Sequence, residues 1–339
     1  MTIQIDMYRV RKFISKLKEK ISSALHHKEI QMILVLFVIS RIFLTLIGII
    51  SDHELSQAPG RIHTAKESPM IALDVWGTWD SGWYLGISQH GYNPRRSTSE
   101  LTYGQASYAF FPLYPLLMRA GGWVLGGNNY LAGLLISNLA LFFSLYYLYK
   151  LTKIYFGEET AWQSARFLLL FPTAFILSGA FTESLFLALT LASFYYARQG
   201  RWWLVGLLGG LSALTRSLGV LLILPMVWEY FKQRKAGARC TWCRGPIWLV
   251  LIPFGLFLFV WYNFRLTGDW LAFAHIQSAW GRQLMNPAGL LHLYEKIRAM
   301  NTENLISLSA SALGLVFLGW SYLRMKQAVP LIIDRKSVV

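Results

Sequence analysis

Long apolar runs separated by short polar segments recur along most of the chain. A helix needs about 20 apolar residues to cross the ~30 Å hydrocarbon core of a bilayer, because each residue adds ~1.5 Å. The run from Met32 to Ile50 has this length, and its single charge is Arg41. We read further runs as spans at residues 130–150, 162–179, 184–198, 203–217, 218–231, 246–264 and 305–323. The pattern predicts an all-α polytopic membrane protein with about eight transmembrane helices.

Two stretches depart from this simple pattern. Residues 110–126 are apolar but begin Phe-Phe-Pro-Leu-Tyr-Pro and end in glycines, which favours a re-entrant or interfacial helix over a short span. The stretch from Trp202 to Tyr230 is long enough for one helix, but Arg216 would then lie near the middle of the bilayer. Because a charge there is costly, we predict a helix break at the Thr-Arg-Ser sequence around Arg216, which moves the charge to the outer surface.

Basic residues between the apolar runs indicate the topology. The N-terminal segment and the loop 232–244 are rich in lysine and arginine, and the positive-inside rule places both in the cytoplasm. Residues 52–107 then form a long first loop on the extracytoplasmic side. These assignments predict a cytoplasmic N-terminal segment, a transmembrane domain and a cytoplasmic tail, with the bounds 1–31, 32–324 and 325–339.

The composition excludes several classes of protein. Hydrophobic residues make up 55% of the chain and charged residues only 14%, against about 25% charged residues in soluble domains. The net charge of +15 is distributed between apolar segments, so we read it as a topology signal and predict no nucleic-acid partner. Two cysteines cannot form a disulfide framework, and Cys240-Thr-Trp-Cys243 lacks a second pair of metal ligands beside it. A soluble enzyme, a secreted scaffold and a disordered chain are excluded.

Under this topology, four uncommon segments share the outer face, namely residues 52–107, 172–184, 215–219 and 265–304. Charges within or beside membrane segments are functional candidates. Asp80 stands in the aromatic sequence Trp-Asp-Ser-Gly-Trp-Tyr. Such a carboxylate is either a plain interfacial residue or, in an apolar setting, a general base; Asp74 is a second candidate. Glu183 begins an apolar run. The simpler interpretation is that Thr182 caps a helix there and Glu183 complements the helix dipole.

Four blocks of sequence, in order, resemble the PIG-V family of membrane mannosyltransferases, which have the GT-C fold. The first block comprises Trp79-Asp80, Tyr84, Ile87, Gly91-Tyr92 and the FFPLYP run from Phe110. The others are FPTAFILSGAFTESLF (171–186), LTRSLG (214–219) and GDWLAFAHIQSAWGR (268–282). The family pattern differs at three positions, Phe171, Phe181 and Leu218. The resemblance implies a GT-C-type helical bundle whose long first outer loop, 52–107, is catalytic, with 265–304 as a second outer loop.

GT-C enzymes take a sugar from a polyprenyl-phosphate carrier and invert its anomeric carbon. The resemblance implies that Asp80 is the base and that Glu183 orients the acceptor or supports the arginines. A phosphate leaving group calls for guanidinium groups, so we expect Arg216, Arg282 or both to bind it. Arg41 is a further phosphate candidate, with pairing to an inner-face carbonyl or carboxylate as the alternative. The remaining residues of the predicted substrate site are Trp79, Tyr84, Tyr92, Gln277 and Trp280.

We predict no metal and no other cofactor. Asp74, Asp80 and Glu183 offer oxygen ligands of the type that a divalent cation prefers, but no Asp-x-Asp pair occurs. The chain has neither a Gly-x-Gly-x-x-Gly fingerprint nor a nucleotide-binding phosphate loop, which favours a lipid-linked donor over a nucleotide sugar. His90 is an alternative proton acceptor, although a loop histidine bonded to backbone is the simpler interpretation.

These features predict an inverting mannosyltransferase that moves mannose from polyprenyl-phosphate-mannose to a glycolipid or glycan acceptor. We expect the bilayer to be a bacterial plasma membrane, with the site on its extracytoplasmic face. The alternatives are a GT-C relative that uses another lipid-linked sugar, a transporter or flippase for such lipids, and a silent carrier-binding subunit. Transporters typically show inverted repeats and midplane charges, and we find no convincing repeat.

Overall fold

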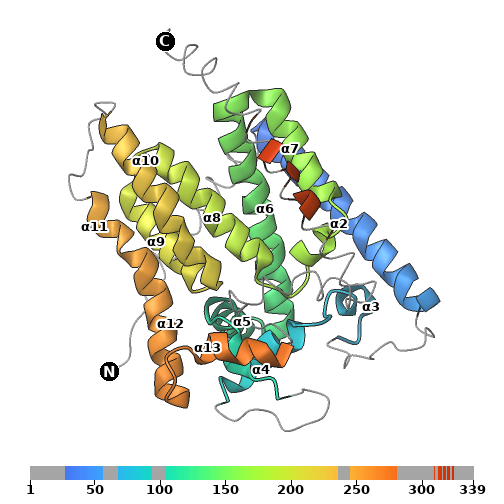
Figure 1. Ribbon diagram of the computed structural model, residues 1–339. Helices are drawn as coiled ribbons and strands as arrows, with labels where there is room; N and C mark the ends of the chain where they lie inside the picture. Colours follow the sequence, from blue (N-terminus) through green and yellow to red (C-terminus); the bar gives the residue numbers. More distant parts are fainter. Residues whose placement is uncertain are drawn as a thin grey trace, which may run out of the picture. The chain divides into compact units, whose positions relative to one another are not determined.

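The computed structural model describes residues 27–55, 68–93, 104–235 and 245–280, together with a few helical positions between 309 and 323 (Figure 1). The chain divides into two units, Met1–Ile276 and Gln277–Val339. The helices discussed below belong to the first unit. The prediction of an all-helical protein is confirmed for the described residues, which form helices joined by turns.

Among the described residues, three helical stretches are long and apolar enough to cross a bilayer. They are α2 (Lys28–Leu55), α6 (Asn129–Phe156) and the pair α11 (Gly245–Leu249) and α12 (Leu251–Thr267). These helices coincide with the spans predicted at 32–50, 130–150 and 246–264. The span predicted at 305–323 falls mostly outside the described residues. The total of eight spans therefore stays a prediction.

Shorter helices form the rest of the bundle: α7 (Glu158–Leu170), α8 (Glu183–Arg198), α9 (Trp202–Ala213) and α10 (Ile223–Lys235). Helices of this size rise only about 18–24 Å, less than the ~30 Å of a bilayer core. The helix predicted at 162–179 ends early, at Leu170. Phe171 is extended there (φ −61°, ψ 135°), because it precedes Pro172 and a residue before proline avoids the helical conformation.

The predicted break around Arg216 is confirmed. Helix α9 ends at Ala213, and Arg216 is fully extended (φ −152°, ψ 147°). A 3₁₀ helix, η4 (Ser217–Leu222), then leads into α10. The segment that begins at Phe110 also forms a short helix, α5 (Leu113–Val124), which stops before Gly126 and Gly127, both with positive φ. Its twelve residues rise only about 18 Å, and the re-entrant or interfacial placement stays a prediction.

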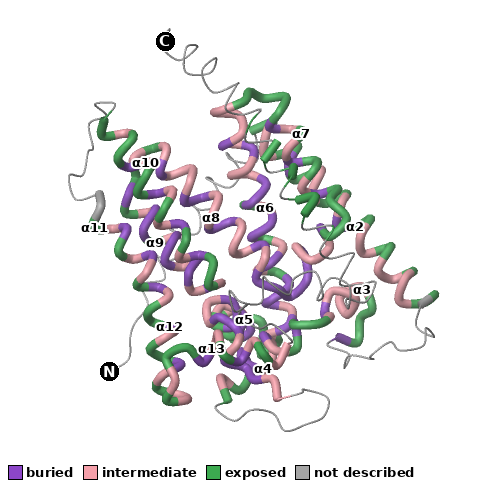
Figure 2. The backbone as a smooth tube through the Cα atoms, viewed as in Figure 1, coloured by how far each residue is buried: buried purple, intermediate pink, exposed green. Residues whose placement is uncertain are grey.

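Two of the apolar cores that hold the bundle together each join three or more helices. One joins α2, α6 and α7 through Ile33, Leu141 and Ala165. The other joins α8, α9, α10 and the start of α12 through residues that include Val205 and Met226. Figure 2 shows buried residues on the facing sides of α6, α8 and α9, whereas large apolar side chains on the outer side of α2 are exposed. Exposed apolar side chains on this scale indicate a surface that lies against lipid.

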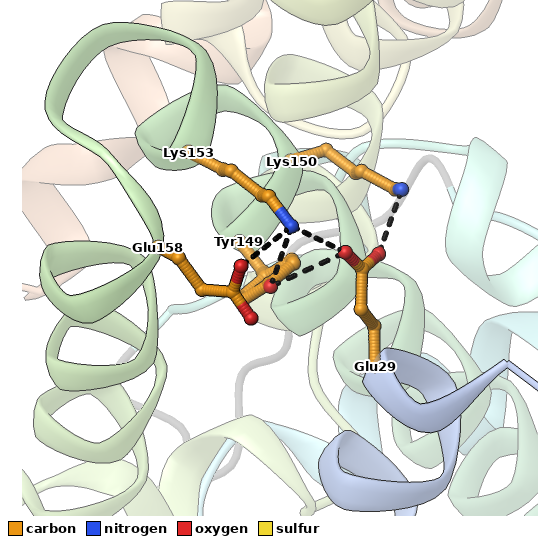
Figure 3. A network of polar contacts seen from close by, with 5 residues as sticks. All are labelled: Glu29, Tyr149, Lys150, Lys153 and Glu158. Atoms are coloured by element: carbon orange, nitrogen blue, oxygen red, sulfur yellow. Dashed lines mark hydrogen bonds and ion pairs between the residues drawn. The ribbon is translucent and has the colours of Figure 1, made fainter.

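The order of contacts gives the bundle two chemically different ends. Helices α6 and α8 start at the same end, since Ser137 near the start of α6 donates a hydrogen bond to Phe181, just before α8. Helix α2 runs the opposite way, because its first turn meets the last turns of α6. There Glu29 accepts hydrogen bonds from Lys150 (2.8 Å) and Lys153 (2.6 Å), as Figure 3 shows. Lysines thus gather at the end opposite α4 (Ser81–His90) and α5.

Candidate active site

The Trp79–Asp80 corner introduces α4. Asp80 is the N-cap residue of α4 and is exposed. Trp79 has φ +49° and is the one non-glycine residue with positive φ among the described residues. A left-handed conformation is strained for a bulky side chain and needs support from its surroundings. That support comes from two rings of the segment between α7 and α8. Phe175 and Phe181 pack against the indole, with centroids 5.8 and 6.3 Å away.

Tyr84 connects α4 to the start of α8. It lies one turn after Asp80, is buried, and packs edge-on against Phe110 (5.2 Å) and Tyr114 (5.3 Å). Its hydroxyl lies 3.4 Å from Oγ1 of Thr182. Burial raises the pKa of Tyr84 above its ordinary value, and the nearby carboxylate of Glu183 adds to this effect. Tyr84 therefore stays neutral and acts as a hydrogen-bonding support.

Glu183 and Arg216 form an ion pair beside Tyr84. Glu183 is the first residue of α8, so the prediction that it starts a helix is confirmed. Arg216 donates through Nη1 to Oε1 of Glu183 and to Oγ1 of Thr182, the latter at 3.2 Å. Thr182 occupies the N-cap position, but its side chain makes no capping hydrogen bond. The capping interpretation is therefore wrong for this hydroxyl, which contacts Arg216 and Tyr84 instead.

These contacts bring residues from three distant segments to one place. Asp80 and Tyr84 come from the start of α4, Glu183 from the start of α8, and Arg216 from the break between α9 and α10. The charges of Glu183, Arg216 and Asp80 all act on the pKa of Tyr84, so they lie within electrostatic reach of one hydroxyl. Both side chains of the ion pair are partly exposed, 40% for Arg216 and 35% for Glu183. A ligand in solvent can therefore reach them.

Other predicted site residues have different neighbours. Tyr92 donates its hydroxyl to Phe110 O (2.8 Å), and its ring packs against Tyr262 of α12. Asp74, in α3 (Ile71–Asp74), accepts a hydrogen bond from Ser68 N (3.0 Å). His90 ends α4. The described contacts of Tyr92 are thus with Phe110 and Tyr262, and its predicted role in substrate binding stays a prediction.

Three further residues of the predicted substrate site come from the fourth sequence block, 268–282. Gln277 and Trp280 lie in η5 (Ile276–Trp280) and belong to the second unit of the chain. Arg282 lies outside the described residues. Their predicted roles in sugar and phosphate binding stay predictions.

A histidine–aspartate pair near the end of α12 was missed by the sequence analysis. Nδ1 of His275 lies 2.7 Å from Oδ2 of Asp269, and both side chains are exposed. Between them, Phe273 of α13 (Ala272–His275) packs on Phe111 at 5.6 Å. The six-residue spacing in GDWLAFAH carried the signal, but it was read only as part of a motif.

Arg41 lies midway along α2 and is 9% exposed. Its Nη1 donates to Ser178 Oγ and to Ala174 O (3.5 Å), so it pairs with a carbonyl of the 172–184 segment, which the predicted topology puts on the outer face. The phosphate role predicted for Arg41 stays a prediction. Nη2 has no hydrogen-bond partner among the described residues. A charge at this depth of a span costs about 2.5–3.5 kcal/mol on insertion scales, so its contacts are expected to have a role.

Within the described ranges, no group of three or more His, Cys, Asp or Glu side chains is placed to hold a metal ion. Glu183 binds the guanidinium group of Arg216. The chemistry available from the described cluster is that of an exposed carboxylate, a buttressed arginine and neutral hydroxyls.

Comparison with known proteins gives two matches. Residues 111–262 match the family described as dolichyl-phosphate-mannose-protein mannosyltransferase. This range holds Glu183 and Arg216 but begins after Asp80. A rat (Rattus norvegicus) protein named GPI alpha-1,6-mannosyltransferase 2 is 27% identical over 189 residues, which cover 51% of this chain and 36% of that protein. The comparisons support a membrane mannosyltransferase family of the GT-C type. They do not single out the PIG-V family within it.

Two further findings set the level at which the comparisons support a function. The chain spans little more than a third of the length of the rat mannosyltransferase it matches, as the 36% coverage shows. No solved structure matches the chain. What the comparisons support is therefore a glycosyltransferase in a membrane, at low identity. The apolar helices α2, α6 and α12 agree with an integral membrane protein.

Proposed function

We propose that the chain is an inverting mannosyltransferase that uses polyprenyl-phosphate-mannose as donor and acts at the extracytoplasmic face of a membrane. The observation that carries this proposal is the cluster of Asp80, Glu183 and Arg216 around the Tyr84–Thr182 contact. Transfer from a lipid phosphate needs a base for the acceptor hydroxyl and a cation for the departing phosphate. The cluster offers both at one end of the bundle.

Asp80 is the base in this proposal. An acceptor hydroxyl oxygen attacks C1 of the mannose while a carboxylate oxygen of Asp80 takes the hydroxyl proton. The bond between C1 and the phosphate oxygen breaks, and its electron pair leaves with the polyprenyl phosphate. Attack from the face opposite the leaving group inverts C1. The supported left-handed turn at Trp79 fixes the start of α4, and with it the carboxylate, before substrate arrives.

Arg216 binds the departing phosphate. A guanidinium group matches phosphate oxygens with a planar fork and stays charged at all relevant pH values. The contacts of Arg216 with Glu183 and Thr182 use Nη1, so phosphate can bind through the rest of the fork while the ion pair persists. Glu183 is then the residue that orients the guanidinium, and it is positioned as the first residue of α8.

The distribution of lysines supports the proposed extracytoplasmic location. Lys150 and Lys153 meet Glu29 at the end of the bundle opposite α4. Lysine and arginine favour the cytoplasmic side of a membrane protein. We therefore assign the end with Asp80 and Arg216 to the outer face of a bacterial plasma membrane, where the carrier headgroup and a glycolipid or glycan acceptor meet.

The test compares three donors in membranes that contain the wild-type protein. They are radiolabelled polyprenyl-phosphate-mannose, polyprenyl-phosphate-glucose and a nucleotide-linked mannose, each supplied with extracted acceptor lipids. We expect label to move to lipid or glycan only from polyprenyl-phosphate-mannose. Membranes without the protein are the control. Transfer from the glucose lipid alone would assign another lipid-linked sugar, and transfer from the nucleotide sugar alone would refute a lipid-linked donor.

A further inference from the structure

Arg41 reaches from the middle of α2 to the irregular segment that joins α7 to α8. Its Nη1 donates to Ser178 Oγ and to Ala174 O, both in or next to η3 (Ala174–Leu177). The other side of the same segment is held by α6. Ser178 donates to Asn138 Oδ1 (2.9 Å), and Asn138 Nδ2 donates to Ser178 O (3.2 Å). A buried arginine and a helix amide thus hold one short segment between them.

This segment needs such partners because it has no α-helix and only the short 3₁₀ helix η3. Polar groups of an irregular backbone must be satisfied by protein or water where a helical bundle meets lipid. Arg41 satisfies one carbonyl and one hydroxyl there, and its side chain is 9% exposed, so the contacts are shielded from water. The shielding makes the geometry of the segment sensitive to the guanidinium.

The held segment is also the one that supports Trp79. Phe175, which directly follows Ala174, packs on the indole, and Phe181 stacks on it three residues after Ser178. Ala180 N donates to Trp76 O (3.3 Å), which adds a backbone tie to the same corner. Trp79 has the positive φ of +49° and directly precedes Asp80. A continuous set of contacts therefore runs from Arg41 through residues 174–181 to the residue before the proposed base.

We propose that Arg41 is a positioning residue for Asp80, which it orients through the 174–181 segment and the ring of Trp79. Its catalytic consequence rests on the proposed function, whereas the structural coupling does not. Loss of the guanidinium lets the segment shift, and the strained turn at Trp79 then relaxes. A displacement of about 1 Å in a catalytic group can lower turnover about 100-fold, although Arg41 touches no reacting atom.

The first experiment measures how accessible the Trp79–Asp80 corner is, and it needs no assay of sugar transfer. Cys240 and Cys243 are the two cysteines of the chain, so a Cys240→Ser, Cys243→Ser background makes Thr78→Cys a unique probe beside Trp79. The rate of maleimide labelling of this probe is compared between the protein that keeps Arg41 and the one that carries Arg41→Met. Lys150→Met is the matched control, because it removes a cation that contacts α2 at the other end of the bundle. Ser178→Ala is a milder variant that keeps the test usable if Arg41→Met folds poorly.

We expect Arg41→Met to change the labelling rate at least about fivefold and Ser178→Ala to change it in the same direction, with Lys150→Met within about twofold. A Phe175→Ala variant should alter the rate in the same way. In that background, Arg41→Met should add less than it does in the wild type, because one of the contacts that connect the segment to Trp79 is already removed. An unchanged labelling rate in folded Arg41→Met and Ser178→Ala proteins would overturn the proposal.

The second experiment measures turnover. We expect Arg41→Met to lower kcat about 10- to 100-fold while KM for the polyprenyl-phosphate donor stays within about threefold. A raised KM with unchanged kcat would show that Arg41 binds the donor directly, and it would overturn the positioning role. If labelling changes as expected but the wild type transfers no sugar, the coupling stands and the proposed function fails.

Discussion

The Arg216–Glu183 pair defines the candidate site at the scale of single residues. The fork of an arginine matters more than its charge where it binds one carboxylate and one phosphate, because a lysine presents a single point of contact. We predict that Arg216→Lys lowers transfer about 10- to 100-fold, since a hydrogen bond to a charged group contributes about 1.5–3 kcal/mol. The measurement is the initial rate against donor concentration.

Arg198→Lys is the matched control for that variant. Arg198 donates to Glu229 at 2.7 Å from the last turn of α8, far along the helix from Glu183. The Arg198→Lys protein should keep its transfer rate within about twofold, because Arg198 lies in the last turn of α8 and Glu183 in the first. Equal losses in both variants would mean that Arg216 has only a structural role.

Tyr84 gives a prediction for pH. Because burial raises the pKa of Tyr84, the folded protein keeps a proton that the unfolded chain releases near pH 10. The stability due to this group is therefore complete below about pH 10 and is lost as the pH rises further. Between about pH 8 and 10.5, the thermal unfolding midpoint of Tyr84→Phe should therefore fall less than that of the wild type. Thermal unfolding in detergent measures both.

The same variant tests whether Tyr84 exchanges protons during transfer. If Tyr84 is only a neutral hydrogen-bonding support, the transfer rate of Tyr84→Phe should depend on pH as the wild-type rate does between about pH 6 and 9. The rate itself should be only modestly lower. A changed pH profile would assign Tyr84 an acid or base role.

At the scale of helices, the sequence predicted what depends on charge and missed what depends on distant packing. The break at Arg216 was predictable because a charge inside a long apolar run has a cost. The early end of α7 was not, although Pro172 carried the signal, because the apolar run continues past it. The contact between Arg41 and Ser178 joins residues 137 apart in sequence, and no local pattern indicates such a contact.

Close packing of α9 on α12 leads to a prediction at this scale. A methyl group added to Gly255 would lie 2.3 Å from the backbone oxygen of Gly210, so the helices would have to separate. We expect Gly255→Ala to lower the free energy of unfolding by about 1–3 kcal/mol, as overpacking does. Thermal or denaturant unfolding measures it.

Gly86→Ala in α4 is the control, because a methyl group there meets no atom within 4 Å. Alanine in a helix interior should be neutral or stabilising by about 0.5–1 kcal/mol. A Gly255→Ala protein as stable as the wild type would contradict the close approach of α9 and α12.

At the scale of the whole bundle, the two ends carry different chemistry. Lysines that bind Glu29 mark one end, and the carboxylates and Arg216 mark the other. We predict that a membrane-impermeant maleimide added to intact cells labels Thr78→Cys but not Glu158→Cys, in the background without native cysteines. Glu158 belongs to the lysine end, where it lies 3.0 Å from Lys153. Labelling of Glu158→Cys alone would invert the proposed orientation.

The central claim is that Asp80 is the base for transfer of a lipid-linked sugar, and one comparison of two aspartates tests it. Asp80→Asn and Asp74→Asn are each assayed with radiolabelled polyprenyl-phosphate-mannose at matched expression. Asparagine keeps the size of the side chain but cannot take a proton. Asp74 lies six residues earlier and accepts a hydrogen bond from Ser68 N. General-base catalysis contributes about 10²–10⁴-fold, so we predict a loss of that size for Asp80→Asn and a change of a few-fold for Asp74→Asn. Full transfer by Asp80→Asn would contradict the account.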